Sequence, residues 1–292
     1  MKKIAIWLLL LAGVLSACAA APRQGKPVEP LKKQEVVQEL IVKEGKTLES
    51  RVKVPEGYQR TQEKKGSLGE FLRAYPLKPH GSPVLLFDKK KKRNQGAHEA
   101  VFKMNLGNRD LQQCADSIMR VYAEYLYQSG QKDKIAFHFV DGFLCDYKHW
   151  RQGYRVAFKK NGKPYWSKKA GAKDDREVFE KYLNVVFAYS STLSMVDETK
   201  KISPKDLKIG DVFLRGGSPG HIVMVVDTCK NEKGELLFLL AQGYMPAQEF
   251  HLLKNPQNNA NPWYRLEEGQ KEISTPEYGF SVDELRRVVY LD

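Results

Sequence analysis

The stretch at residues 219–228 reads P-G-H-I-V-M-V-V-D-T. It places a histidine at the start of an apolar run, directly after a proline and a glycine. A short apolar run rich in β-branched residues predicts a buried strand over 221–228. Because side chains alternate along a strand, His221 shares one side with Val223 and Val225, and residues 222, 224 and 226 take the other.

The stretch continues into a predicted β-hairpin. A polar turn at 230–234 separates it from a second apolar run at 235–242, and residues 212–214 predict a further strand upstream. With the turn centred on residues 231–233, residue 221 pairs with about residue 242, so Gln242 lies beside His221. An amide neighbour fixes one tautomer of the imidazole and leaves the other nitrogen free to act as a base.

A helix is predicted over residues 110–130, and it carries Cys114 in its first turns. Apolar residues recur at 111, 115, 118, 122 and 125, with Asp110 as the N-cap and Gly130 as the stop. The helix N-terminus favours a thiolate, so we expect a lowered pKa for Cys114, although Asp116 opposes this. Backbone N–H groups at the same end are candidates to hold an oxyanion. We expect this helix to pack on the sheet face that carries His221.

Each of these residues also has a structural interpretation. Free cysteine is among the most buried residue types, so Cys114 is also typical of a core position. His221 alone is also typical of a strand end. The cleft residues that we expect around them, for oxyanion or substrate contacts, are Asn108, Gln113, Tyr244 and Gln248.

The composition indicates a folded chain with a basic surface. The 292 residues are 42% hydrophobic and 11% aromatic, which supports one large domain or two small ones. The net charge of +13 favours an acidic partner, such as an anionic lipid or wall polymer. The basic run 89–93 reads as a solvated turn, and no nucleic-acid-binding signature is present, so we expect no nucleic acid partner.

The first residues predict an exported protein. A charged start, an apolar run over residues 4–15 and the sequence L-S-A-C at 15–18 resemble a bacterial lipobox. Lipidation of Cys18 implies an anchor in the membrane of the cell envelope, facing the periplasm or in the outer membrane. A plain secretory signal is the alternative. We therefore predict a signal peptide at 1–17, a lipidated cysteine and tether at 18–45, and a single domain at 46–292.

The remaining segments complete an α+β fold. Residues 135–170 form an aromatic-rich, hairpin-like insertion with a turn at Asn161-Gly162, and residues 175–195 predict a second amphipathic helix. If Cys114 is catalytic, Cys145 and Cys229 are the only possible disulfide partners for each other, and the sequence leaves their pairing open. The histidines and cysteines lack metal-ligand spacing, so we predict no metal and no cofactor.

Two resemblances follow from these residues. A helix-initial cysteine, L-K-I-G-D-V-F at 207–213, P-G-H-I-V-M-V-V-D and a polar residue on the next strand resemble the NlpC-like and CHAP-like cysteine peptidases of the papain superfamily. That resemblance implies a papain-like fold and catalysis by Cys114, His221 and Gln242, although Q-C-A replaces the usual D-C-S around the nucleophile. The mature chain also resembles a family of uncharacterised bacterial lipoproteins, which carries no established activity.

Two function hypotheses result. In the first, the protein is a thiol hydrolase that cleaves amide bonds, most of all in cell-wall peptides. In the second, it is a non-catalytic envelope module that binds a wall polymer or a partner protein through the aromatic stretch Tyr147–Trp166. An open groove at Cys114 favours the enzyme, and a sealed Cys114 beneath exposed rings favours the binder.

Overall fold

The computed structural model describes residues 39–289, which belong to one compact unit. The predicted signal peptide, Cys18 and most of the predicted tether lie outside the described residues. Leu40 is buried in the main hydrophobic core, so packed residues extend upstream of the predicted boundary at residue 46. None of the helices in the described part of the chain has the length and apolar character needed to cross a membrane.

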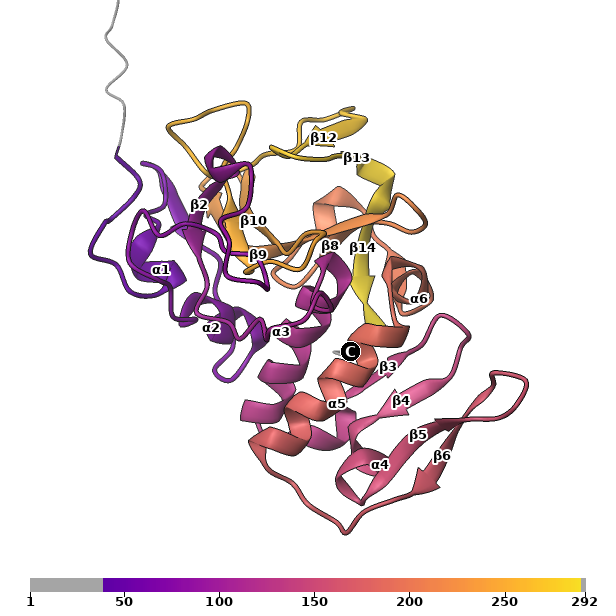
Figure 1. The fold of residues 1–292 in the computed structure, drawn as a ribbon. Coiled ribbons are helices and arrows are strands. Elements are labelled where there is room, and N and C mark those ends of the chain that lie inside the picture. The colour runs from indigo at the N-terminus through magenta and orange to yellow at the C-terminus, as the bar shows by residue number, and fades with distance from the viewer. Residues whose placement is uncertain (1–38, 290–292) are drawn as a thin grey trace, which may run out of the picture. The chain divides into compact units, whose positions relative to one another are not determined.

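The described residues form helices of 15 and 14 residues, several shorter helices and mostly short strands (Figure 1). The α-helices are α1 (Leu48–Arg51), α2 (Leu68–Arg73), α3 (Cys114–Gln128), α4 (Tyr147–Arg151), α5 (Arg176–Tyr189) and α6 (Thr192–Asp197). The 3-10 helices are η1 (Gln95–Ala97), η2 (Lys132–Lys134), η3 (Pro204–Asp206) and η4 (Val282–Glu284). The strands are β1 (Tyr58–Arg60), β2 (His98–Val101), β3 (Ala136–His138), β4 (Leu144–Asp146), β5 (Tyr154–Phe158), β6 (Pro164–Lys168), β7 (Thr199–Lys201), β8 (Val212–Arg215), β9 (His221–Asn231), β10 (Leu236–Gln242), β11 (His251–Leu253), β12 (Glu272–Ser274), β13 (Gly279–Ser281) and β14 (Leu285–Val288).

An antiparallel sheet forms the centre of the described residues. Its strand order is β2-β11-β10-β9-β8-β14-β7, and β1 pairs with the far end of β9. Three separate two-stranded sheets are formed by β3-β4, β5-β6 and β12-β13. The prediction of an α+β fold with antiparallel strands at 212–214, 221–228 and 235–242 is therefore confirmed.

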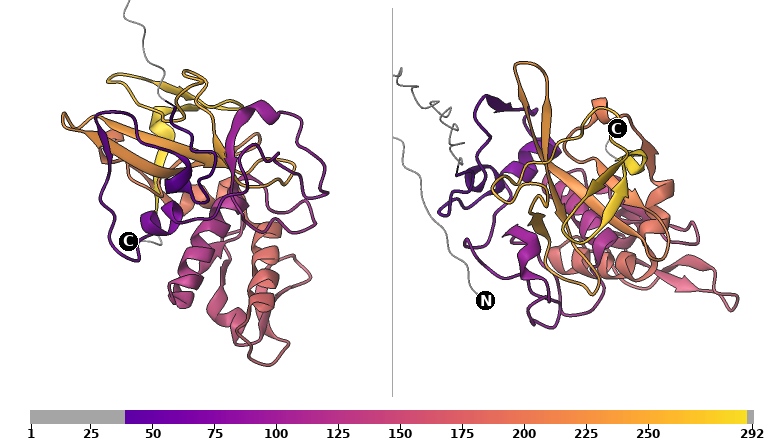
Figure 2. Two further views of the ribbon diagram at one scale, coloured as in Figure 1. Left: turned by 90° about the vertical axis from the view of Figure 1, so that its left-hand side faces the viewer. Right: turned by 90° about the horizontal axis from the view of Figure 1, so that it is seen from above.

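The two faces of β9 belong to different cores. Residues 222, 224 and 226 join the main cluster, which contains Cys114 and Ile118 of α3. Val223 and Val225 join a second cluster with Phe280 of β13. Figures 1 and 2 show α3 and α5 side by side below the sheet and the β12-β13 hairpin above it. The expectation that α3 packs on the face of His221 is therefore wrong, because α3 shares its core with residues 222, 224 and 226 on the opposite face of β9.

The strand pairing next to His221 also differs from the prediction. Leu236 pairs with Lys230 and Ala241 with Met224, and the register shifts between Leu239 and Leu240. Extended by three residues from the Ala241–Met224 pair, this ladder places residue 221 opposite residue 244, two residues past Gln242. The position of the turn causes this offset, and the irregularity reduces it by one residue. Gln242 instead pairs through its backbone with His251 of β11. A contact between Gln242 and His221 is made by their side chains, as described below.

The second predicted helix is divided in two. α5 begins after the N-cap Asp175 and ends at Tyr189, and α6 begins after Ser191, whose side chain accepts from the backbone N–H of Leu193. A serine that caps a helix start requires an extended backbone at that position, so the chain turns at 190–191. This break brings residues 187–188 and 190–192 close to the start of β9.

The aromatic segment is more buried than predicted. Tyr147 is fully buried and Trp150 is nearly so, and both rings, which belong to α4, pack against Tyr182 of α5. Asn161-Gly162 forms the predicted turn, between β5 and β6. The exposed rings of this region are instead Phe158, Tyr165 and Tyr189.

Candidate active site

Gly220 and the first residue of α6 place His221 at the start of β9. A Cβ atom on Gly220 would lie 2.4 Å from the hydroxyl oxygen of Thr192 in α6. Only glycine permits this close approach, so the chain enters β9 directly against α6. His221 is 3% exposed, and its ring lies 4.6 Å from that of Tyr244 and 4.9 Å from that of Tyr278, measured between centroids.

Gln242 fixes the tautomer of His221. The His221 Nε2 and the Gln242 Oε1 are 2.8 Å apart, and a carbonyl oxygen accepts, so Nε2 carries the hydrogen. The lone pair of the neutral ring is then on Nδ1, which is the nitrogen available as a base. The structure thus brings together two of the residues that the sequence singled out, although through their side chains and not through strand pairing.

The other end of the Gln242 amide is held by residues that sequence reasoning missed. Its Nε2 donates to the Glu277 carboxylate at 2.9 Å, and Lys92 donates to the same oxygen at 2.6 Å. His251 donates from Nδ1 to the backbone carbonyl of Glu249 and presents Nε2 at 3.4 Å from both Lys92 and Gln242. Lys92 and His251 are nearly or fully buried. Since they come from distant segments, no sequence pattern joins them.

Cys114 is the first residue of α3, four residues later than the predicted start. The backbone N–H of Gln113 donates to the Asp116 carboxylate at 3.0 Å, and the Ser117 hydroxyl donates to the backbone carbonyl of Gln113 at 2.7 Å. Asp110 is not the N-cap. Its carboxylate accepts from the Gln113 side chain at 3.0 Å and from the backbone N–H of Ala247 at 2.7 Å, which ties the helix start to the segment after β10.

The pKa of Cys114 is raised, whereas the sequence predicts that it is lowered. Cys114 is 8% exposed, and burial raises the pKa of its thiol to about 11, with Asp116 adding to the increase. The backbone N–H groups of Ala115, Cys114 and Ile222 interact with the sulfur and lower the pKa by less. The lowered pKa that a helix N-terminus alone predicts is therefore wrong, since desolvation outweighs it. Ile222 directly follows His221, so the sulfur lies beside the start of β9.

His221 is also neutral at physiological pH. Burial lowers its pKa to about 4, Gln242 opposes this, and the positive charge of Lys92 adds to the decrease. A neutral thiol and a neutral imidazole therefore coexist in the resting site. A neutral imidazole can accept the thiol proton, so this state is competent for base catalysis.

One cleft contains both side chains. Its volume is about 580 Å³. It is lined by Asp110, Leu111, Gln113 and the first residues of α3 (114–116), residues 187–188 and 190–192 at the α5–α6 junction, residues 217–220, His221, Tyr244, Met245 and Tyr278. Of the further residues predicted for the cleft, Gln113 and Tyr244 line it. Asn108 is exposed and Gln248 is buried, and neither belongs to the lining.

The structure also answers two questions about the other cysteines and histidines. Cys114, Cys145 and Cys229 are all free and buried, so Cys145 and Cys229 are not bonded to each other. Among residues 39–289, no group of three His, Cys, Asp or Glu side chains has a geometry suited to a metal ion.

A comparison with family models identifies the chain. Residues 48–287 match the family described as domain of unknown function 4846. The chain belongs to this family. The match runs from α1 into β14 and includes Cys114, His221, Gln242 and Glu277. No curated protein and no solved structure matches the chain significantly. What this member of the family does has to be argued from the chemistry of its cleft.

Proposed function

We propose that the protein is a thiol hydrolase that cleaves amide bonds in cell-wall peptides. The observation that carries the proposal is that Cys114 and His221 line one cleft while Gln242 holds His221 in the tautomer with a free Nδ1. A papain-like arrangement, with a cysteine at a helix start and a histidine at a strand start, is part of this proposal. Export and a lipid anchor at Cys18 are also part of it, since a cell-wall substrate lies outside the cytoplasm.

The mechanism begins with the neutral pair. His221 Nδ1 takes the thiol proton as the Cys114 sulfur attacks the substrate carbonyl carbon, and a tetrahedral intermediate forms. Backbone N–H groups at the start of α3 hold its oxygen. The imidazolium then gives the proton to the amine as the C–N bond breaks, which leaves a thioester on Cys114. Water attacks the thioester with His221 as base, and the acid and the free thiol are released.

The cleft surroundings support a peptide substrate. Tyr244, Tyr278 and the exposed Met245 give apolar surface at its wall and mouth, and serine and threonine side chains from 190–192 give hydrogen-bonding groups. Such a mixture of apolar walls and a few polar groups is typical of sites for small organic ligands and peptides.

The test uses residues 22–292, which keep every described residue. The protein is incubated with soluble peptides released from purified peptidoglycan, and new amino groups and masses are followed by mass spectrometry. We expect cleavage by the wild type. Cys114→Ala should abolish it, and His221→Ala should lower the rate by about 10²–10⁴-fold, the usual contribution of a general acid–base. The matched controls are Cys229→Ala and His149→Ala, with thermal unfolding to check folding. A folded wild type that cleaves none of these peptides, or a fully active Cys114→Ala variant, overturns the proposal.

A second candidate is a non-catalytic envelope module that binds a wall polymer. The observation in its favour is the exposure of Phe158, Tyr165 and Tyr189, each 40–43% exposed. If the chain binds insoluble peptidoglycan but cleaves no peptide from it, this candidate replaces the first.

A further inference from the structure

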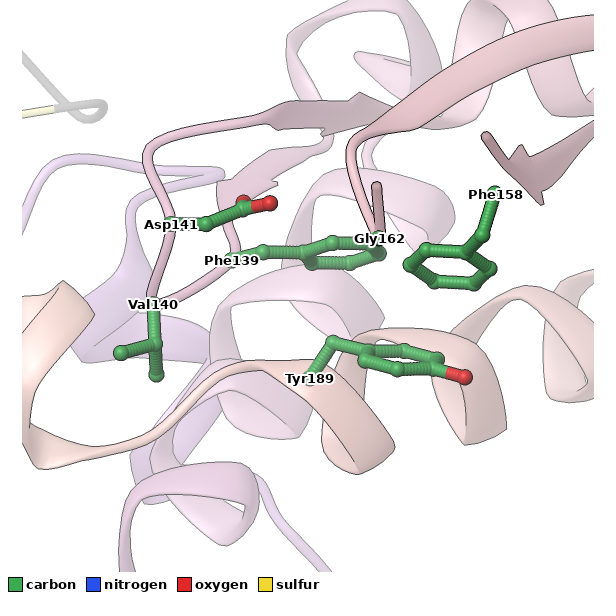
Figure 3. A pocket seen from close by; sticks show the side chains of 6 residues that line it. All are labelled: Phe139, Val140, Asp141, Phe158, Gly162 and Tyr189. Atoms are coloured by element: carbon green, nitrogen blue, oxygen red, sulfur yellow. The ribbon is translucent and has the colours of Figure 1, made fainter. Parts of the chain in front are cut away.

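A second hollow lies next to the cleft, and three aromatic rings line it (Figure 3). Its volume is about 480 Å³, and its lining consists of Phe139, Val140, Asp141, Phe158, Gly162 and Tyr189. These residues come from the β3-β4 loop, the β5-β6 hairpin and the end of α5. The hollow shares no residue with the cleft that holds Cys114.

The rings form a partly uncovered platform. The ring of Tyr189 lies 5.1 Å from that of Phe139 and 4.9 Å from that of Phe158, at interplanar angles of 32° and 40°. Phe139 is buried, but Tyr189 and Phe158 are each 43% exposed. Large apolar side chains grouped in a concavity and left in contact with water are typical of a binding surface.

Charged groups surround this platform. Asp141 accepts from the backbone N–H of Phe143 with one carboxylate oxygen, at 3.0 Å, and the other oxygen remains available to a ligand. The β5-β6 turn that contributes Gly162 also carries Lys159, Lys160 and Lys163, all exposed. Within the described residues none of these three lysines pairs with an acidic side chain. The rim therefore offers one acceptor for hydroxyl groups and three donors for anions.

The end of α5 separates the hollow from the cleft. Tyr189 lines the hollow, and the residues on either side of it, Ala188 and Ser190, line the cleft that contains Cys114. A ligand that fills both sites thus needs a part that stacks on rings and a part that reaches the thiol. The two parts lie on opposite sides of a single turn of chain.

We propose that the hollow binds a sugar ring of an anionic glycan whose peptide branches enter the cleft. The C–H face of a sugar stacks on Tyr189 and Phe158, Asp141 accepts a sugar hydroxyl, and the lysines of the turn pair with carboxylates of the polymer. A lipid surface suits the site less, because the hollow is concave and carries the Asp141 carboxylate, which is unfavourable in an apolar layer. The role of the peptide branch rests on the proposed function, whereas sugar binding does not.

Binding is measured with the Cys114→Ala variant of residues 22–292, so that retention does not depend on cleavage. The protein is sedimented with insoluble peptidoglycan, with chitin as an uncharged glycan, and with vesicles of phosphatidylglycerol and phosphatidylcholine. We expect retention on peptidoglycan, less on chitin and none on vesicles. Tyr189→Ala and Phe158→Ala should each weaken the apparent affinity by about tenfold, the equivalent of about 1.4 kcal/mol.

Matched variants control for surface effects. Tyr165→Ala removes an exposed ring from the other face of the same hairpin, because Tyr165 pairs with Ala157 and Phe158 with Pro164. It should leave binding unchanged. Reversing Lys159, Lys160 and Lys163 to Glu should abolish binding at low salt, and reversing Lys89, Lys91 and Arg93 should not.

Three outcomes overturn the inference. Tyr165→Ala could weaken peptidoglycan binding as much as Tyr189→Ala does, the protein could bind vesicles in preference to peptidoglycan, or Tyr189→Ala and Phe158→Ala could leave retention on peptidoglycan unchanged. Failure of the proposed function has a different signature. In that case peptidoglycan is bound in the ring-dependent manner described here, but the chain with Cys114 intact cleaves no peptide.

Discussion

Glu277 determines how the Gln242 amide faces His221. A glutamine amide has an accepting end and a donating end, and the two have nearly the same shape. Glu277 accepts hydrogen bonds only, so the donating end of Gln242 must point towards it, at 2.9 Å. The accepting end then points to His221 and requires a hydrogen on Nε2. If the amide were reversed, the hydrogen would move to Nδ1 and His221 could not act as the base towards the cleft.

We therefore predict that Glu277→Gln populates the second tautomer of His221. A glutamine at 277 can donate as well as accept, so the orientation of Gln242 is no longer determined. Nitrogen chemical shifts of the His221 ring, measured by NMR, should show Nε2–H alone in the wild type and a mixture in the variant. Cleavage should slow by about tenfold in kcat/KM, the equivalent of one hydrogen bond of ~1.4 kcal/mol.

The control for this variant is Glu272→Gln, on the exposed side of the same hairpin. It should leave both the tautomer and the rate as in the wild type. An unchanged His221 tautomer in Glu277→Gln would show that Gln242 is held by other contacts. The NMR measurement does not depend on catalysis, so it remains informative if the chain cleaves no peptide.

At the scale of elements, the end of β10 lies against the start of α3. A Cβ atom on Gly243 would lie 2.1 Å from the Ser117 hydroxyl oxygen and 2.8 Å from the backbone carbonyl oxygen of Gln113. Real Cβ atoms do not approach other atoms so closely. Glycine at this position therefore allows the segment that carries Gln242 to meet the helix turn that carries Cys114.

Gly243→Ala should separate these two elements. We expect the free energy of unfolding to fall by about 1–3 kcal/mol, as for other overpacked positions, together with a loss of cleavage activity. Gly279→Ala is the matched control, because a Cβ atom there meets nothing within 4 Å. Urea denaturation and the peptide assay report the two effects. Wild-type stability and activity in Gly243→Ala would show that β10 and α3 adjust without separating.

The elements also show how much of the fold can be predicted from the sequence. The strands 221–228 and 235–242 and the helix with Cys114 follow from periodicity, which depends only on neighbouring residues. The face that α3 covers depends on which side chains of β9 fill the space against the helix. The division of α5 from α6 depends on the cap made by Ser191. Both are properties of packing and backbone geometry that the spacing of apolar residues does not encode.

The candidate site shows the same limit. The residue types and local positions of Cys114, His221 and Gln242 are sufficient to predict them as candidates for catalysis. Glu277 and Lys92 lie at least 35 residues from Gln242 along the chain and meet it only through the fold. The pKa of Cys114 could not be predicted either, because the local effect of the helix start is smaller than the desolvation imposed by the whole cleft.

At the scale of the whole molecule, His221 couples protonation to global unfolding. It stays neutral in the folded chain until about pH 4, whereas an unfolded histidine takes up a proton near pH 6.5. Between these values the unfolded state binds a proton that the folded state excludes, so lowering the pH favours unfolding. Buried carboxyl groups with raised pKa, such as Asp116, Glu99 and Asp211, act in the opposite direction.

The contribution of His221 to stability is isolated by comparing the free energy of unfolding of the wild type with that of His221→Asn. The carboxyl groups are present in both the wild type and His221→Asn, so their contributions largely cancel. As the pH falls from 6.5 to 4, the stability of the wild type relative to His221→Asn should decrease by about 3 kcal/mol. Urea denaturation at pH 7, 6, 5 and 4 measures this change. If the difference for His221→Asn is constant over this range, the imidazole is solvated in the folded protein, and the buried base on which the proposed mechanism depends is absent.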